Sequence, residues 1–190
     1  MSRYELHKNA GTVNYADWQE NKGIKIPIFD IDGTLTEHKS LVLDNEVMLG
    51  LEQQAINKIF PNIAIVSNNP NLKHVEAVSH MVAERLSVNV FSTCIAEGYA
   101  KKPNPIMGQV VANHFNVKTE NLGIVGDRRI SDITLAKKLG AGAMALCAKV
   151  GIEDAPFVPL VRIGERVIVV AEWATGRIKN NLLKLEDRQL

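Results

Sequence analysis

The chain has 190 residues, of which 46% are hydrophobic and 23% are charged, and its formal net charge is +1 at pH 7. These values are typical of one soluble globular domain and exclude a disordered chain, a fibrous repeat and a strongly basic nucleic-acid binder. Its two cysteines, Cys94 and Cys147, are too far apart in sequence for a paired metal-ligand motif. We therefore expect reduced thiols and a cytoplasmic location.

The start of the chain contains no continuous apolar segment, so the sequence predicts no signal peptide. No apolar run reaches the ~18 residues that a membrane-spanning helix needs. From Ile24 onward, short apolar runs typical of buried strands alternate with segments of helical period. The predicted strands are Ile24–Phe29, Ile63–Val66, Val88–Ser92, Leu122–Val125, Ala143–Cys147 and Val167–Val170.

Helices are predicted between these strands, and several carry helix-end signals. They span Glu46–Phe60, Pro70–Leu86 (with Asn69 as its cap), Pro105–Phe115 and Ser131–Leu139, which ends at Gly140. This alternation predicts an α/β fold with a doubly wound parallel sheet, formed as a single domain over residues 1–190. Its core is expected at about 24–147, followed by a C-terminal strand and helix within 156–190. Pro27 is unexpected in the first strand, because proline lacks the backbone donor that a central strand uses.

Polar side chains follow the predicted strands, at the edge of the sheet where ligands bind. Asp30 and Asp32 come directly after the first strand, and Gly33 allows a sharp turn there. Two carboxylates so close are costly unless a cation neutralises them, whereas a helix cap needs only one acceptor. His38, a few residues further on, is expected to be a solvated loop residue.

The later strands add a hydroxyl, two amides, lysines and two more carboxylates at the same edge: Ser67, Asn68, Asn69, Lys101, Lys102, Asp127 and Asp132. Ser67 and Asp132 could each be simple helix caps, and either lysine alone could be a surface charge. Together the set predicts a site for a hard cation such as Mg²⁺.

These motifs resemble those of the haloacid dehalogenase (HAD) superfamily of phosphatases. The similar segments are DIDGT at 30–34, Ser67, Lys102 within KKPNP, and GDRRISD at 126–132, in the superfamily's order. A narrower resemblance is to the phosphatidylglycerophosphatase-like branch of HAD subfamily IIIA. The segments similar to that branch are GIKIPIFDIDGTLT, IVSNNP, AKKPNP, GDRRISDI and the tail RIKNNLLKLE. Members of that branch often carry asparagine at the position of Gly33.

The resemblance implies a Mg²⁺-dependent phosphomonoesterase with an aspartyl-phosphate intermediate. Asp30 would be the nucleophile and Asp32 the general acid and base. Mg²⁺ would be held by Asp30, Asp127 and the backbone carbonyl of Asp32. The substrate phosphate would be bound by Ser67, Asn68 and Lys102, with the lysine also stabilising charge during the transfer. Asp132 would orient the metal or the lysine without reacting itself.

The substrate is less well defined by the sequence. Only 32 residues lie between Thr34 and Ser67, so no large cap domain fits there. An open site suits a large phosphate ester, such as phosphatidylglycerophosphate, or a site covered by a second subunit of a homo-oligomer. Residues 176–190 are expected to form an amphipathic helix that either docks on the core or contacts an anionic membrane. The alternatives are a sugar or nucleotide phosphatase and a non-catalytic module that binds phosphate or a partner.

Overall fold

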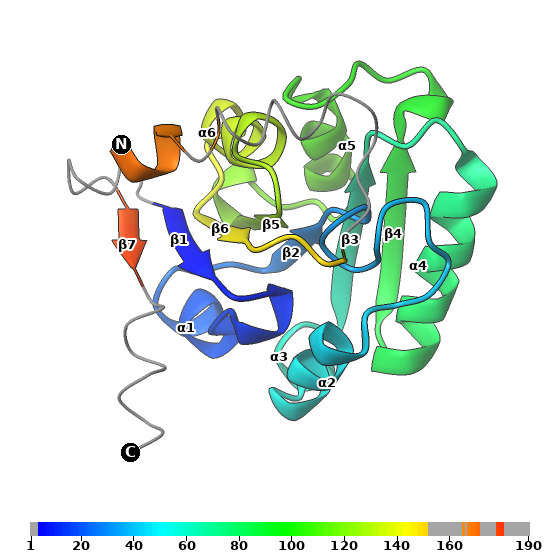
Figure 1. The fold of residues 1–190 in the computed structure, drawn as a ribbon, viewed down its shortest axis with the longest axis horizontal. Helices are drawn as coiled ribbons and strands as arrows, with labels where there is room; N and C mark the ends of the chain where they lie inside the picture. The colour runs from blue at the N-terminus through cyan, green and yellow to red at the C-terminus, as the bar shows by residue number, and fades with distance from the viewer. Residues whose placement is uncertain (1–3, 152–164, 166, 172–177, 181–190) are drawn as a thin grey trace.

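The computed structural model describes residues 4–151, 165, 167–171 and 178–180. Its centre is a seven-stranded sheet in which all paired strands run parallel, in the order β4-β3-β2-β5-β6-β1-β7 (Figure 1). The strands are β1 (Tyr4–His7), β2 (Ile26–Phe29), β3 (Asn62–Ser67), β4 (Asn89–Cys94), β5 (Leu122–Gly126), β6 (Ala143–Cys147) and β7 (Ile178–Asn180). Five of the six strands predicted from apolar runs are confirmed, and β2 lies inside the sheet, between β3 and β5.

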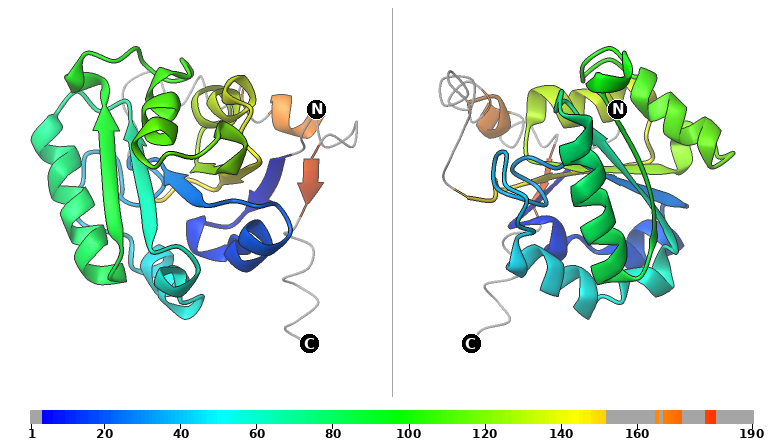
Figure 2. Two further views of the ribbon diagram at one scale, coloured as in Figure 1. Left: turned by 180° about the vertical axis from the view of Figure 1, so that it is seen from behind. Right: turned by 90° about the vertical axis from the view of Figure 1, so that its right-hand side faces the viewer.

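Helices cover both faces of the sheet, as the alternating pattern predicts (Figure 2). They are α1 (Tyr15–Glu20), α2 (Asn45–Gln53), α3 (Ile56–Ile59), α4 (Leu72–Leu86), α5 (Ile106–His114) and α6 (Thr134–Leu139). A π-helical turn (Arg129–Ile133) leads into α6, and short 3₁₀ turns lie at 10–12, 95–97 and 119–121. The doubly wound α/β fold is therefore confirmed, without a large cap domain among the described residues. None of the described helices has the length and apolarity needed to cross a bilayer.

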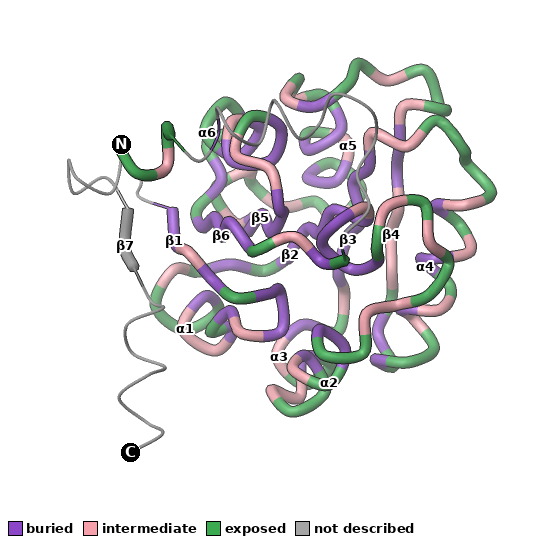
Figure 3. Tube along the Cα trace, in the orientation of Figure 1, coloured by how far each residue is buried: buried purple, intermediate pink, exposed green. Residues whose placement is uncertain are grey.

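The core has two halves because successive strand residues point to opposite faces of the sheet. Phe29 packs in the half beneath α1, α2 and α4, whereas its neighbour Ile28 packs in the half beneath α5 and α6. Figure 3 shows β2, β3, β5 and β6 as largely buried, whereas exposed residues lie mainly on the helices and loops. The buried strands hold their carboxyl ends in fixed register, which positions the loops described below.

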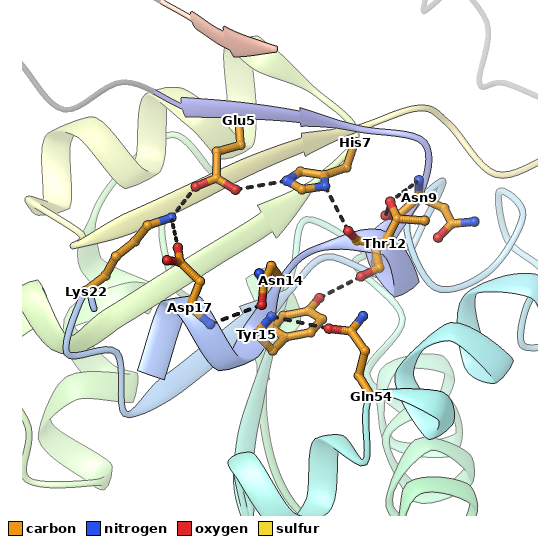
Figure 4. Close-up of polar contacts among 10 residues, drawn as sticks. Glu5, His7, Asn9, Thr12, Asn14, Tyr15, Asp17, Lys22 and Gln54 are labelled. Atoms are coloured by element: carbon orange, nitrogen blue, oxygen red, sulfur yellow. Dashed lines mark hydrogen bonds and ion pairs between the residues drawn. The ribbon is translucent and has the colours of Figure 1, made fainter. Parts of the chain in front are cut away.

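The first 25 residues contribute a strand that apolar patterning did not reveal. Strand β1 lies between β6 and β7, and a polar network anchors it (Figure 4). Glu5 pairs with His7 (Oε2 to Nε2, 3.0 Å) and with Lys22, which also pairs with Asp17 (3.2 Å). Burial raises the pKa of Glu5, but the hydrogen bonds and charges of His7 and Lys22 outweigh it and lower this pKa to about 2. This carboxylate is therefore ionised and fixes the strand to the loop after α1.

Two helix predictions need correction. The expected helix over Glu46–Phe60 is divided into α2 and α3, because Ala55 adopts a left-handed conformation with φ 49°. Helix α4 begins at Leu72 with Asn71 as its cap, and not at Pro70. Asn69, the expected cap, hydrogen-bonds elsewhere, as described in the next section.

The C-terminal predictions were wrong wherever the structure describes them. Val167–Val170, expected as a strand, lies in a helical segment, and Val167 and Val170 are exposed, unlike strand residues covered on both faces. Ile178–Asn180, expected within an amphipathic helix, forms β7 and pairs with β1. Short apolar runs do not distinguish strand from helix, and the pairing partner here lies near the other end of the chain. The rest of the expected helix at 176–190 lies outside the described residues.

The structure also accounts for Pro27. This residue lies opposite Gly123 of β5, and the ladder between β2 and β3 begins only at Ile28. The missing backbone donor is therefore next to the end of a ladder, where it costs less than in the interior.

Candidate active site

Two neighbouring strands bring the principal carboxylates together. The pairing between β2 and β5 extends to Phe29 and Val125. Asp30 and Asp127 come just after these residues and therefore leave the same edge of the sheet side by side. Asp132, in the turn after β5, joins them, and one carboxylate oxygen from each of the three lies within 4.8 Å of the others. All three residues are buried. The structure therefore assembles carboxylates that are up to 102 positions apart in sequence.

Two glycines let the chain pass close to this cluster. Gly33 has a φ of +86°, and a Cβ atom there would lie 2.5 Å from Oδ2 of Asp127. A Cβ atom at Gly126 would lie 2.3 Å from Cγ of Asp132. A side chain at either glycine would displace a carboxylate, because real contacts are never so short.

Lys102 lies inside the cluster, and the neighbouring Lys101 is exposed. The Nζ atom of Lys102 lies 2.8 Å from Oδ1 of Asp30 and 2.7 Å from Oδ1 of Asp132. Burial lowers the pKa of Lys102, but Asp132 and Asp30 outweigh burial and raise this pKa above its usual range. Lys102 is therefore a buried cation. Of the two adjacent lysines, Lys102 contacts the carboxylates and Lys101 is a surface charge.

The pKa of the Asp30 carboxyl is also raised, which disfavours its charged form. Burial raises its pKa, Lys102 lowers it, and Asp132 and Asp127 raise it again, giving a pKa of about 7 instead of 3.8. Burial and the neighbouring carboxylates thus disfavour the charged form of Asp30, although Lys102 contacts it. A further cation would stabilise the charged form of these carboxylates. Their oxygen atoms are the ligands that a hard divalent cation such as Mg²⁺ prefers.

Asp132 is the member most fully engaged by the protein. Besides Lys102, it accepts hydrogen bonds at Oδ2 from the backbone N–H of Arg128 (3.1 Å) and the Ser131 hydroxyl (3.2 Å). These bonds support the expected role of Asp132 in orienting the lysine, and the role itself stays a prediction. Metal binding by Asp30 and Asp127 stays a prediction.

Asp32 lies outside the carboxylate cluster and is half-buried. Its Oδ1 atom accepts a hydrogen bond from the backbone N–H of Lys39 (2.7 Å) and lies 3.7 Å from Nδ1 of His38. Its Oδ2 atom accepts a hydrogen bond from Nδ2 of Asn69 (3.1 Å). His38, expected as a solvated loop residue, is thus partly buried beside this carboxylate. A role of the Asp32 backbone in metal binding stays a prediction.

Ser67 and Asn68 end β3 on the same edge of the sheet. The Ser67 hydroxyl is buried and accepts a hydrogen bond from the backbone N–H of Asn69 (3.0 Å). The Asn68 side chain accepts from the backbone N–H of Lys102 (2.7 Å) and donates to its carbonyl (3.4 Å). The Asn68 amide thus holds the loop that bears Lys102, and its expected role in phosphate binding stays a prediction. Phosphate binding by Ser67 stays a prediction.

Sequence reasoning placed Asn69 at the edge of the site but predicted no contact between it and Asp32, and it assigned no site role to the loop at Lys39. A second asparagine after a strand was interpreted as a helix cap, a role that needs only local contacts. The contact from Asn69 to Asp32 joins residues 37 positions apart, so no local pattern in the sequence indicates it.

The profile of a family described as mitochondrial PGP phosphatase matches residues 6–153. A curated relative from Arabidopsis thaliana, phosphatidylglycerophosphate phosphatase 1, chloroplastic/mitochondrial, is 27% identical over 140 residues. The matched region covers 70% of this chain and 38% of that protein, so the chain spans less than half of its relative. The name of this relative gives it a chloroplast or mitochondrial location. The cytoplasmic location expected for this chain from its sequence stays a prediction.

Solved structures with similar folds include two bacterial proteins. An uncharacterized protein from Listeria monocytogenes serotype 4b is 18% identical, with a TM-score of 0.48, and the match covers 78% of this chain and 99% of that one. A haloacid dehalogenase-like family hydrolase from Xanthomonas campestris is 12% identical, with a TM-score of 0.45, and the match covers 75% and 96%.

Proposed function

The chain belongs to the mitochondrial PGP phosphatase family, and on this basis we propose that it is a Mg²⁺-dependent phosphomonoesterase acting on a phosphatidylglycerophosphate-like lipid. The observation that carries the proposal is the buried group of Asp30, Asp127 and Asp132 around Lys102. A non-catalytic binding module would not need three buried carboxylates and a lysine in this costly arrangement.

Asp30 is the proposed nucleophile. Its carboxylate attacks phosphorus, the bond from Asp30 to phosphorus forms, and the bond from phosphorus to the leaving oxygen breaks. Asp32 gives its proton to that leaving oxygen. In the second half of the reaction, Asp32 takes a proton from water, which attacks phosphorus and releases Asp30 and inorganic phosphate.

Three further groups support this chemistry. Lys102 contacts the nucleophile at 2.8 Å and is placed to offset charge on the transferred phosphoryl group. The Ser67 hydroxyl lies at the end of β3, beside the nucleophile's strand, and is proposed to donate to a phosphoryl oxygen. Mg²⁺, held by Asp30 and Asp127, would reduce the repulsion between the nucleophile and the anionic substrate when bound.

Exposed apolar side chains around the site favour a lipid over a sugar or nucleotide phosphate. Leu41 and Val42, in the loop between β2 and α2, are 51% and 74% exposed. Further exposed apolar residues begin the helices or turns that follow β3, β4 and β5: Leu72, Ile106 and Ile130. Since all these strands are parallel, these residues lie toward the catalytic edge of the sheet.

Charge on this edge fits the same substrate. Lys39, Lys73 and Lys101 are exposed and lie near the apolar residues in sequence. A surface of apolar side chains mixed with cations suits the headgroup region of an anionic bilayer. The phosphate of a membrane lipid would then meet Asp30 without leaving the bilayer surface.

The experiment is phosphate release from phosphatidylglycerophosphate in anionic vesicles, compared with sugar and nucleotide phosphates. We expect Mg²⁺-dependent release from the lipid that chelator abolishes and that Asp30→Asn eliminates. Leu41→Asp and Val42→Asp should lower release from vesicles by about 10-fold and leave a short-chain soluble analogue nearly unaffected. Leu49→Asp is the matched control, because Leu49 is 43% exposed but lies on α2.

Two results would contradict the lipid assignment. Preference for a sugar or nucleotide phosphate would favour the small-molecule alternative, with the site covered by another subunit. Absence of release from every substrate would favour a phosphate- or partner-binding module. Titration with vesicles that contain no substrate measures membrane contact separately from turnover.

A further inference from the structure

Donors from two separate segments hold the carboxyl group of Asp32. The backbone N–H of Lys39, in the loop after β2, binds Oδ1 at 2.7 Å. The Asn69 amide, in the loop after β3, binds Oδ2 at 3.1 Å. The two bonds together fix the rotation of the carboxyl group about its side-chain torsions, which a single bond does not do.

Asn69 is itself held firmly. Its backbone N–H donates to the Ser67 hydroxyl (3.0 Å), and its Oδ1 atom accepts from the backbone N–H of Asn71 (2.9 Å). Because Oδ1 faces a donor, the amide must present Nδ2 to Asp32. The reverse orientation would place Oδ1 against the carboxylate and Nδ2 against an N–H group.

We propose that Asn69 is a positioning residue that orients Asp32 for proton transfer to the leaving oxygen. This inference rests on the proposed function, in which Asp32 protonates the leaving group. Each carboxyl oxygen has two lone-pair positions, so one fixed donor per oxygen leaves a position for the transferred proton. Asn69 therefore restrains the acid without blocking it, and the proton moves from Asp32 as the bond from phosphorus to oxygen breaks.

Orientation of a general acid matters in proportion to the leaving group's need for a proton. An alkoxide leaves poorly unless it is protonated, whereas p-nitrophenolate is a stable anion and leaves without one. General-acid catalysis typically contributes ~10²–10⁴-fold when a proton is required. Loss of positioning should thus lower turnover of an alkyl ester far more than turnover of an aryl ester.

The test compares kcat/KM for short-chain phosphatidylglycerophosphate, an alkyl ester, with kcat/KM for p-nitrophenyl phosphate. Asn69→Asp keeps the Oδ1 acceptor for Asn71 and replaces the donor that Asp32 needs, and Asn69→Ala removes both without adding charge. We expect each variant to lower the alkyl-to-aryl ratio about 10-fold or more. The negative charge that Asn69→Asp adds would repel the phosphate group of both esters, so this effect cancels in the ratio.

Asn71→Ala is the matched control, since the Asn71 side chain caps α4 through its bond to the His74 N–H (3.3 Å), whereas the hydrogen bonds to Asp32 come from Lys39 and Asn69. This variant should leave the ratio unchanged. Equal losses on both esters in the Asn69 variants, or no loss, would overturn the inference while wild-type turnover upholds the proposed function. Absence of wild-type turnover on both esters would overturn the proposed function and this inference with it.

Discussion

Replacement of Lys102 by methionine should be strongly destabilising, although it preserves side-chain length. The ammonium group is 2.8 Å from Asp30 and 2.7 Å from Asp132, and the lysine is only 4% exposed. Removing it leaves the buried carboxylates of Asp30 and Asp132 without the cation that contacts both. Breaking a buried ion pair by removing one partner typically costs about 3–5 kcal/mol, and we expect a loss of that order.

The assay is urea unfolding at pH 8 in chelator, followed by circular dichroism. Lys101→Met is the matched control, because Lys101 is exposed and such changes stay within about 0.5 kcal/mol. The pKa of Asp30 is about 7 with Lys102 in place, and removing this lysine, which lowers that pKa, should raise it further, so the carboxyl becomes increasingly neutral in the variant as the pH falls from 8 to 6. The destabilisation should therefore shrink at pH 6, and Mg²⁺ at pH 8 should recover part of it.

A Lys102→Met variant within about 1 kcal/mol of wild type would refute this reasoning. Equal effects of Lys101→Met and Lys102→Met would refute it as well. Either result would mean that Lys102 does not compensate the buried carboxylates in solution.

Three further predictions concern parts of the fold that support the site. Because the folded-state pKa of Glu5 is lowered from 4.5 to about 2, its charged form stabilises the protein by up to about 3 kcal/mol above pH 4.5, and this contribution is lost as pH falls toward 2. The unfolding free energies of wild type and Glu5→Gln should therefore differ most above pH 4.5 and converge as the pH falls from 4.5 to 2. Gly123→Ala should cost about 1–3 kcal/mol and shift tryptophan fluorescence, because the new Cβ would lie 2.4 Å from the Trp18 ring; an unchanged melting temperature would contradict this. Asp127→Asn should abolish the rise in melting temperature that Mg²⁺ gives the wild type, and an undiminished rise would exclude Asp127 as a ligand.

The central part of the fold was predictable because its determinants are local. Each of β2, β3, β5 and β6 is a short apolar run, and parallel strands end at one edge of the sheet. Asp30 and Asp127 were therefore predictable as neighbours from their places after two strands. The glycine at position 33 was expected to allow a turn, and its closeness to Asp127 adds a second reason for it.

The parts that could not be predicted depend on contacts between distant segments. Strand β1 is four residues long and mixed in polarity, and its pairing with β6 depends on residues about 140 positions later. The apolar run Val167–Val170 suits a helix as well as a strand, so its composition does not indicate which of the two forms. The amides of Asn68 and Asn69 resemble caps in sequence, and their bonds to Lys102 and Asp32 follow from the packing of three loops.

The most direct test of the proposed chemistry is detection of a phosphoryl group on Asp30 during turnover. Wild-type protein would be mixed with radiolabelled phosphatidylglycerophosphate and Mg²⁺, quenched in acid within milliseconds, and mapped by peptide. The account predicts a hydroxylamine-sensitive label on the peptide containing Asp30, absent in chelator and absent in Asp30→Asn. Phosphate release without that label, or release that persists in Asp30→Asn, would contradict the assignment of Asp30 as the nucleophile.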